Sequence, residues 1–266
     1  KSKMIFIRMY SLDRFIKREI NVFMYIDQLC NIENGTTNIY IYKKKYRMSN
    51  QITHVTIVRH GQTHWNNELR LQGWKDEEGC QLTKEGLLQA RALGARFERE
   101  KARFDIVYCS DLGRALTTMQ LAIERLNIKP SNIKIDKRFR ERSFGKFEGL
   151  TKPLLAERFS REWARMKTGD PAWKPEEGES ANGVKKRAWE ALLELIDKHR
   201  GKSILLVSHG GTIALLLQQI LNMPSGQSGK IHIRNTSIST VSFDEENVPT
   251  LTSMGDDAHT KMLSEF

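Results

Sequence analysis

Two apolar runs that lie far apart in the chain stop abruptly at the same dipeptide, His-Gly. They read Val-Thr-Ile-Val-Arg-His-Gly (residues 55–61) and Ile-Leu-Leu-Val-Ser-His-Gly (residues 204–210). Short continuous apolar runs rich in branched residues are typical of strands that are buried on both faces of a parallel sheet. Ligands of open α/β sheets bind beyond the carboxyl ends of such strands. The pattern therefore predicts a parallel sheet that brings two imidazoles to one edge.

From residue 51 onward, strand-like and helix-like segments alternate. Strands are expected at residues 55–58, 104–109, 133–135, 204–207 and 237–243. Helical spacing of apolar residues, with Thr83 and then Ser110 or Asp111 as N-caps, predicts helices at about residues 83–101, 110–126, 152–167, 181–199 and 212–221. Strands separated by helices form sheets covered on both faces. The expected fold is therefore α/β, a three-layer α/β/α arrangement with a mostly parallel central sheet, and residues 237–243 are expected to close it as an edge strand.

Residues 1–47 differ in composition from everything after them. They hold no Pro and no Ala, and their 10 Lys and Arg against 4 Asp and Glu carry +6 of the total charge of +11. The segment begins with Lys1, and Met48 stands just before the first strand-like run. We interpret residues 1–47 as an N-terminal extension, such as translated upstream sequence, that adds nothing to the chemistry, and residues 48–266 as the catalytic domain. Acidic residues interrupt the basic ones and no signal-peptide core is present, which disfavours a nucleic-acid arm, a membrane-surface arm or a targeting peptide.

Composition narrows the class of protein further. No apolar run approaches the ~20 residues of a membrane helix. Three cysteines, Cys30, Cys80 and Cys109, are too few and too scattered for a disulfide framework or a structural zinc site, which favours reduced thiols and a cytoplasmic location. Outside residues 1–47 the charge surplus is modest, and a site for anionic small molecules would account for it.

Polar residues that follow the predicted strands form a compact chemical set. They are Arg59, His60, Arg114, Glu141 and His209. Guanidinium forks bind phosphate oxygens in a bidentate manner. A neutral imidazole can attack phosphorus, and a carboxylic acid can protonate the departing oxygen. The set therefore predicts phosphoryl transfer.

Four motifs in this order resemble the histidine phosphatase superfamily, which includes the cofactor-dependent phosphoglycerate mutases and related phosphatases. The motifs are Arg59-His60-Gly61-Gln62-Thr63-x-x-Asn66, Ser110-Asp111-Leu112-x-Arg114-Ala115, Arg140-Glu141-Arg142-x-Phe144-Gly145 with Phe147-Glu148-Gly149, and Ser208-His209-Gly210-Gly211. The resemblance covers roughly residues 52–263 and implies a phosphoglycerate mutase-like fold.

The resemblance also implies roles for individual residues. His60 would be the nucleophile that becomes phosphohistidine, and Glu141 would be the proton donor to the leaving group and then the base for water. Arg59, Arg114 and His209 would hold the phosphoryl oxygens. Further contacts to phosphate or to the mouth of the site would come from Asn66, the backbone of Gly210, Gln62, Thr63, Gln72 and Gly73. No metal and no other cofactor is implied.

Alternatives remain for single residues. Glu148 is a second carboxyl close to Glu141 in the sequence and competes for the role of acid. His64 and His232 are interpreted as structural or peripheral, and a zinc site built from His60, His64 and His209 lacks a carboxylate or thiolate at metal spacing.

The same chemistry can serve a mutase, which returns the phosphoryl group to a second hydroxyl, or a phosphatase, which lets water in. Mutases of this family carry a long insertion after the Glu motif, whereas only about 55 residues separate Gly145 from the strand before His209 here. The tail at residues 255–259 and the Ser-His-Gly-Gly-Thr form at residues 208–212 resemble the phosphatase branch. We therefore favour a metal-independent phosphatase acting on a small phosphorylated metabolite, with residues 152–180 selecting the substrate.

Two classes of function without catalysis compete with this hypothesis. A nucleic-acid-binding protein would act through the basic residues of segment 1–47, and its binding would depend steeply on salt. A phosphate-binding module on an inactive phosphatase fold would bind phosphate groups without turning them over. Neither class is favoured, and no nucleic acid or membrane is expected as a partner. The sequence leaves the oligomeric state open, with a homodimer as one option.

Overall fold

The computed structural model describes residues 6–7, 24–33, 36–45 and 51–261, and the chain divides into two compact units, residues 1–50 and residues 51–266. In the first unit, β1 (Phe6–Ile7), β2 (Met24–Glu33) and β3 (Thr36–Lys45) form an antiparallel sheet in that order. The strands predicted from the sequence all lie after residue 51, so this antiparallel sheet was not predicted. The second unit carries every candidate site residue.

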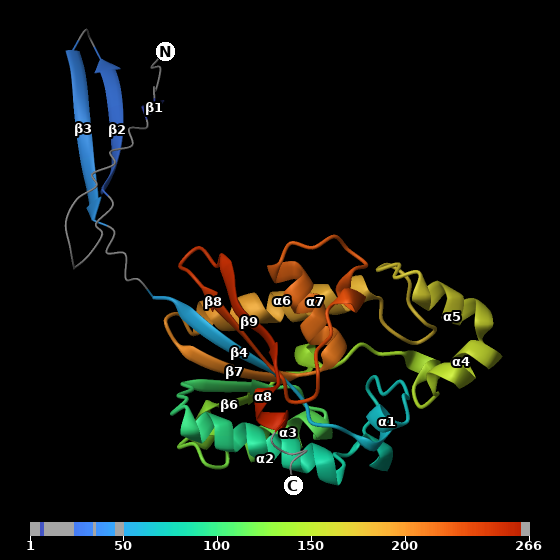
Figure 1. Cartoon of the computed structure of the whole chain (residues 1–266). Helices are drawn as coiled ribbons and strands as arrows, with labels where there is room; N and C mark the ends of the chain where they lie inside the picture. Colours follow the sequence, from blue (N-terminus) through green and yellow to red (C-terminus); the bar gives the residue numbers. More distant parts are fainter. Residues whose placement is uncertain (1–5, 8–23, 34–35, 46–50, 262–266) are drawn as a thin grey trace. The chain divides into compact units, whose positions relative to one another are not determined.

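The second unit is built on a six-stranded mixed sheet in the order β6-β5-β7-β4-β8-β9 (Figure 1). Its strands are β4 (Thr53–Arg59), β5 (Ile106–Cys109), β6 (Ile133–Ile135), β7 (Ser203–Ser208), β8 (Ile238–Phe243) and β9 (Pro249–Asp256). Strands β6, β5, β7 and β4 are parallel neighbours, whereas β8 and β9 pair antiparallel. The two strands that end in His-Gly, β4 and β7, lie side by side with Arg59 opposite Ser208. This register brings the two imidazoles to the same edge.

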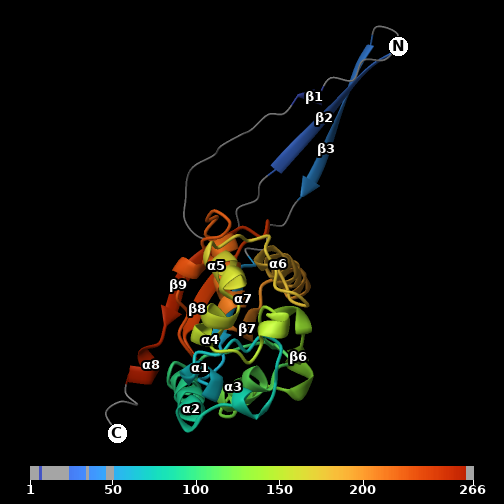
Figure 2. The same cartoon turned by 90° about the vertical axis from the view of Figure 1, so that its right-hand side faces the viewer.

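Helices cover both faces of this sheet, which confirms the predicted three-layer α/β/α arrangement (Figures 1 and 2). One face packs against α2 (Lys84–Arg99) and α3 (Gly113–Ile123), through a core that includes Leu93, Met119 and Val207. The other face packs against α6 (Ala181–Lys198) and α7 (Gly210–Ile220), through a core that includes Leu192, Leu206 and Leu216.

Short elements complete the second unit. They are α1 (His64–Asn67), α4 (Lys152–Arg158), α5 (Ser160–Lys167), α8 (Ala258–Lys261) and the 3₁₀ turns Glu78–Cys80, Pro130–Asn132, Lys137–Phe139, Gly145–Phe147 and Ser228–Lys230. Among the residues that the structure describes, no helix combines the length and the apolar character needed to cross a bilayer.

Capping side chains explain where two of the long helices begin. Thr83 accepts a hydrogen bond from the backbone N–H of Gly86 at the start of α2, and Ser180 accepts one from Gly183 at the start of α6. Each such cap is worth about 1 kcal/mol. The helix after β5 differs from the prediction, because α3 begins without a side-chain cap after Leu112. The two predicted caps are engaged elsewhere, since the Ser110 hydroxyl contacts a histidine and the Asp111 carboxylate pairs with an arginine.

Two further predictions about the fold were wrong. The helix expected at residues 152–167 is interrupted at Phe159, whose backbone leaves helical geometry (φ −133°, ψ 50°). The ring of Phe159 packs on Phe147 at a centroid distance of 5.2 Å, within a small apolar cluster that also holds Leu155 and Trp173. Strand β8 is not an edge strand, because β9 pairs along its outer side.

Candidate active site

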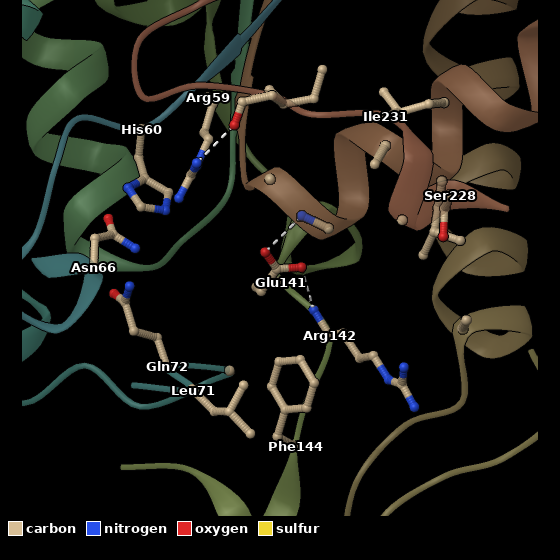
Figure 3. A pocket seen from close by; sticks show the side chains of 18 of the residues that line it. Arg59, His60, Asn66, Leu71, Gln72, Glu141, Arg142, Phe144, Ser228 and Ile231 are labelled. Carbon is tan, nitrogen blue, oxygen red and sulfur yellow. Dashed lines mark hydrogen bonds between the residues drawn. The ribbon is translucent and has the colours of Figure 1, made fainter. Parts of the chain in front are cut away.

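A pocket of about 410 Å³ opens where the carboxyl ends of β4, β5 and β7 meet (Figure 3). Eight of the predicted site residues line it: Arg59, His60, Asn66, Gln72, Gly73, Arg114, Glu141 and Gly210. His209 is fully buried directly beside it, with its ring centroid 5.1 Å from that of His60. The structure therefore brings together five chemical groups that come from four separate parts of the chain.

His60 is held in one tautomer by the main chain. Its Nδ1 lies 2.7 Å from the carbonyl oxygen of Gly61. A carbonyl oxygen can only accept a hydrogen bond, so Nδ1 of the neutral ring carries the proton and Nε2 carries the lone pair. The side chain is only 3% exposed, which limits its motion. Nε2 is therefore the nitrogen available for attack on phosphorus.

The neutral form of His60 is also favoured electrostatically. Burial lowers the pKa of His60 well below its ordinary value, and the neighbouring guanidiniums of Arg114 and Arg59 lower it further. The pKa of His209 is likewise well below its ordinary value, mainly because of burial and then because of Arg114. An unprotonated imidazole keeps the lone pair that a nucleophile needs.

Several buried polar atoms around the pocket have no hydrogen-bond partner among the described residues. They are Nε of Arg59, Nε of Arg114, Nδ1 of His209 and Oε1 of Gln72. Buried polar atoms are nearly always paired in folded proteins. Three of the four are nitrogens, and the pocket beside them is also lined by the basic side chains of Arg70, Arg142 and Lys152. This pattern indicates a binding site for the oxygens of an anionic ligand.

The two arginines are fixed by backbone carbonyls rather than by carboxylates. Nη1 of Arg59 donates to the carbonyl of Ile233 at 2.7 Å. Arg114, which is 1% exposed, donates to the carbonyls of Lys75 at 3.0 Å and Gly73 at 2.7 Å. Burial lowers the pKa of both guanidiniums, yet arginine stays charged in proteins. Glu141 lies close enough to act on both charges, but neither guanidinium is bonded to a carboxylate among the described residues, so both stay available to an anionic ligand.

Glu141 supplies a carboxylate at the opposite wall of the pocket, facing the His60 side (Figure 3). Its Oε2 accepts from the backbone N–H of Gly211 at 2.9 Å, and its Oε1 accepts from the N–H groups of Thr212 at 3.1 Å and Arg142 at 2.8 Å. Oε2 thus keeps one position that can carry or receive a proton.

Glu148, the alternative acid, is engaged in holding a loop. Its Oε1 accepts hydrogen bonds from the backbone N–H groups of Trp74 at 3.0 Å and Phe144 at 2.9 Å and from the hydroxyl of Ser143 at 3.0 Å. It does not belong to the described residues that line the pocket. Its geometry favours a structural role.

Gln62 and Thr63 were predicted to line the mouth, and the structure places both outside the pocket. Thr63 is fully buried and caps α1 through a reciprocal pair of hydrogen bonds with Asn66. The side-chain oxygen of Gln62 accepts from the hydroxyl of Thr83 at 2.8 Å, which ties the loop to the start of α2. Both side chains are used to shape the loop that carries Asn66.

Gly61 is required for close packing of the loop after β4. A Cβ at this position would lie 2.6 Å from the carbonyl oxygen of Gly86 on α2. Its backbone N–H donates to the hydroxyl of Thr118 on α3 at 2.9 Å. The first turns after β4 are therefore packed directly onto the helical layer, which fixes the direction of the His60 side chain.

Several residues that shape the site were not predicted from the sequence. Ser110 lies 2.8 Å from Nε2 of His209. Asn235 donates to the carbonyl of His60 at 2.9 Å. His232, interpreted as peripheral, lines the pocket. Ser110 belongs to the Ser-Asp-Leu motif noted in the sequence, and the need of a buried His209 for a hydroxyl partner is the signal that points to it. No signal in the sequence marks Asn235.

The basic residues that follow β6 are sorted clearly by their partners. Arg138 pairs with Asp136 and Glu194, Arg140 with Asp111, and Lys146 with Glu176. Arg142 lines the pocket and donates to the carbonyls of Glu179 and Trp173.

No group of three or more His, Cys, Asp or Glu among the described residues is arranged to hold a metal ion.

Comparisons with known proteins agree with this geometry. The family model of the histidine phosphatase superfamily (branch 1) matches residues 55–257. A "probable phosphoglycerate mutase GpmB" from Salmonella arizonae is 32% identical over 192 residues, which cover 72% of this chain and 85% of the relative. The solved structure of YhfR from Bacillus stearothermophilus superposes with a TM-score of 0.72 at 29% identity, covering 78% of this chain and 99% of that one. A phosphoserine phosphatase variant from Entamoeba histolytica, solved in complex with phosphoserine, gives a TM-score of 0.67 at 29% identity and covers 78% of this chain and 98% of that one. The chain belongs to the histidine phosphatase superfamily.

Proposed function

We propose that this protein is a metal-independent phosphatase that hydrolyses small phosphate monoesters through a phosphohistidine intermediate. The observation that carries the proposal is the arrangement around His60, whose Nδ1 is bound to the Gly61 carbonyl while its Nε2 faces a pocket lined by two guanidiniums, Arg59 and Arg114, that are bonded to backbone carbonyls. The substrate is a small phosphorylated metabolite, and no nucleic acid or membrane takes part.

In the first half of the reaction, the ester phosphate binds between Arg59, Arg114 and His209. Nε2 of His60 attacks phosphorus, and the bond between phosphorus and the ester oxygen breaks. Glu141, in its protonated form, transfers its proton to the departing oxygen, so that an alcohol leaves rather than an alkoxide. The cationic groups stabilise the charge that the phosphoryl oxygens carry during transfer.

In the second half, water takes the place of the alcohol. Glu141, now a carboxylate, removes a proton from this water as its oxygen attacks phosphorus and the bond to Nε2 of His60 breaks. Inorganic phosphate leaves, and Glu141 is protonated again for the next cycle. One group therefore acts first as acid and then as base.

Two observations are in line with hydrolysis. Between Glu141 and α6 the described residues form only the 3₁₀ turn Gly145–Phe147, the short helices α4 and α5 and their connecting loops, so this part of the chain holds no long insertion that could exclude water. The chain also aligns over almost the whole length of a phosphoserine phosphatase. The relative named as a probable phosphoglycerate mutase keeps the mutase as the second candidate.

A phosphate-release assay on a panel of small phosphate esters, without added metal, tests the proposal. We expect release with the wild-type protein and none with His60→Ala, which should also fail to form an acid-labile phosphoenzyme. Conversion of 3-phosphoglycerate to 2-phosphoglycerate in the presence of 2,3-bisphosphoglycerate, faster than phosphate release, would instead establish the mutase. Unchanged phosphate release by pure His60→Ala would refute the nucleophile assignment.

A further inference from the structure

Arg187, on α6, is bonded to the backbone of the loop that presents Glu141. Its Nη1 donates to the carbonyls of Arg138 at 2.7 Å and Arg140 at 3.0 Å. Its Nη2 donates to the carbonyl of Glu141 itself at 3.0 Å. Three main-chain oxygens within four residues are thus held by one guanidinium.

Glu179, at the end of the loop before α6, completes the arrangement. Its two carboxylate oxygens accept from Nε and Nη2 of Arg187, both at 2.8 Å. Oε2 also accepts from the backbone N–H of Ser143 at 3.0 Å, on the far side of Glu141. Burial alone would raise the pKa of Glu179, but the hydrogen bonds from Arg187 and Ser143 outweigh it and hold the pKa below its ordinary value. The pair is therefore charged at neutral pH and bonded to the loop on both sides of the acid.

All five N–H donors of the Arg187 guanidinium are used in this way. Its side chain is only 19% exposed, and that of Glu179 is 21% exposed. Neither residue belongs to the described residues that line the pocket, so neither can touch a substrate there. Because every donor of this guanidinium is bonded to one loop or one carboxylate, Arg187 is held in a fixed position and is not a free surface charge. We call the pair Arg187 and Glu179 the bracket.

We propose that Arg187, fixed by Glu179, is a positioning residue that sets the place of the Glu141 carboxyl for proton transfer. The first turn of α7 holds the carboxylate end of Glu141, and Arg187 holds its backbone end. Both anchors are needed because a misplacement of about 1 Å can cost about 10²-fold in rate. This inference rests on the proposed role of Glu141 as general acid.

The test compares two esters that differ in how much they need an acid. p-Nitrophenyl phosphate releases a stable phenolate without protonation, whereas glycerol 2-phosphate releases an alkoxide unless it is protonated. We expect Arg187→Lys, which keeps the charge but loses the fork, to lower kcat/KM for glycerol 2-phosphate by roughly 10²-fold. The loss for p-nitrophenyl phosphate should be about tenfold smaller, because kcat/KM covers only the steps through alcohol release.

Glu179→Gln is a second variant that removes charge from the bracket without removing bulk, and it should show the same selective loss to a smaller degree. Arg96→Lys is the matched control, since Arg96 is 14% exposed and pairs with Asp256 and Glu100 away from the pocket. It should leave both kcat/KM values unchanged.

The outcomes separate this inference from the proposed function. If the wild-type protein releases no phosphate from any ester, the proposed function fails and this inference fails with it. A second outcome is that the wild-type protein is active but Arg187→Lys and Glu179→Gln each lose the same factor in kcat/KM for both esters and also melt at a lower temperature. The bracket then only supports the fold, and the positioning role is overturned.

Discussion

Oε2 of Glu141 accepts a hydrogen bond of 2.9 Å from the backbone N–H of Gly211, in the first turn of α7. A Cβ at position 211 would lie 2.6 Å from Oε1 of the same carboxylate. The glycine is therefore the reason that this carboxylate can reach the end of the helix.

Gly211→Ala should displace the Glu141 carboxylate and lower turnover of alkyl phosphates by roughly 10²-fold, because proton transfer depends on exact placement. Stability should not fall for reasons of helix propensity, since Ala is favoured over Gly within helices by about 1 kcal/mol. Steady-state kinetics on glycerol 2-phosphate and a thermal melt measure the two effects. Gly183→Ala is the matched control, because the nearest atom to its Cβ would lie at an ordinary 3.4 Å. Full activity of Gly211→Ala would show that the carboxylate needs no such approach.

Glu141→Gln should lower kcat/KM for alkyl phosphates by roughly 10²- to 10⁴-fold and affect p-nitrophenyl phosphate much less, because an amide cannot transfer a proton. Glu148→Gln is the isosteric control, since its side-chain oxygen can still accept the bonds from Trp74 and Phe144. A selective loss in Glu148→Gln, with Glu141→Gln unaffected, would reverse the two assignments.

Stability should fall on acidification because buried histidines are neutral in the folded protein. His60 and His209 have pKa values well below the ordinary 6.5, and burial lowers the pKa of His259 to about 4. The unfolded chain takes up protons below about pH 6.5 while the folded chain does not. Their contribution is therefore complete above pH 6.5 and is lost as the pH falls toward 4, at up to about 1.4 kcal/mol per pH unit for each group. Urea unfolding between pH 4 and pH 7 measures the slope, and His259→Asn should make it shallower. A free energy of unfolding that rose below pH 6.5 would contradict this account.

Residues 51–266 should be sufficient for activity. Every residue assigned to the pocket lies in this unit, and residues 1–50 form a separate one. A protein that begins at residue 51 should keep kcat/KM and melting temperature within error of the full chain. A marked loss of solubility or rate would show that the first unit takes part in the fold or the chemistry.

The main features of the fold could be predicted because parallel strands buried on both faces leave a strong apolar signal. The ends of two strands, at Arg59-His60 and at Ser208-His209, could be predicted for the same reason. The sequence does not predict that β4 and β7 are neighbours, because pairing between distant strands depends on the whole sheet. Strand β9 was missed because it begins with Pro249, alternates half-exposed and exposed side chains, and includes Gly255 in a left-handed conformation (φ +68°).

The errors at the site share one physical origin. Gln62 and Thr63 stand within the Arg-His-Gly motif, but hydrogen bonds to Thr83 and to the α1 backbone engage them outside the pocket. Arg187 and Glu179 were overlooked in the opposite way, because charged residues on or next to an amphipathic helix usually face solvent. Competition between local and distant partners decides these cases, and it can be judged only when both partners are in place.

The hydrogen bond from His60 Nδ1 to the carbonyl of Gly61 has a consequence for how this protein can vary. Many catalytic imidazoles are oriented by a carboxylate side chain, which a single codon change can delete. Here the orienting atom belongs to the main chain, and every amino acid supplies it. Substitution of neighbouring side chains therefore does not change the tautomer of His60. Mutations around the pocket can alter substrate preference while Nε2 stays the reactive nitrogen.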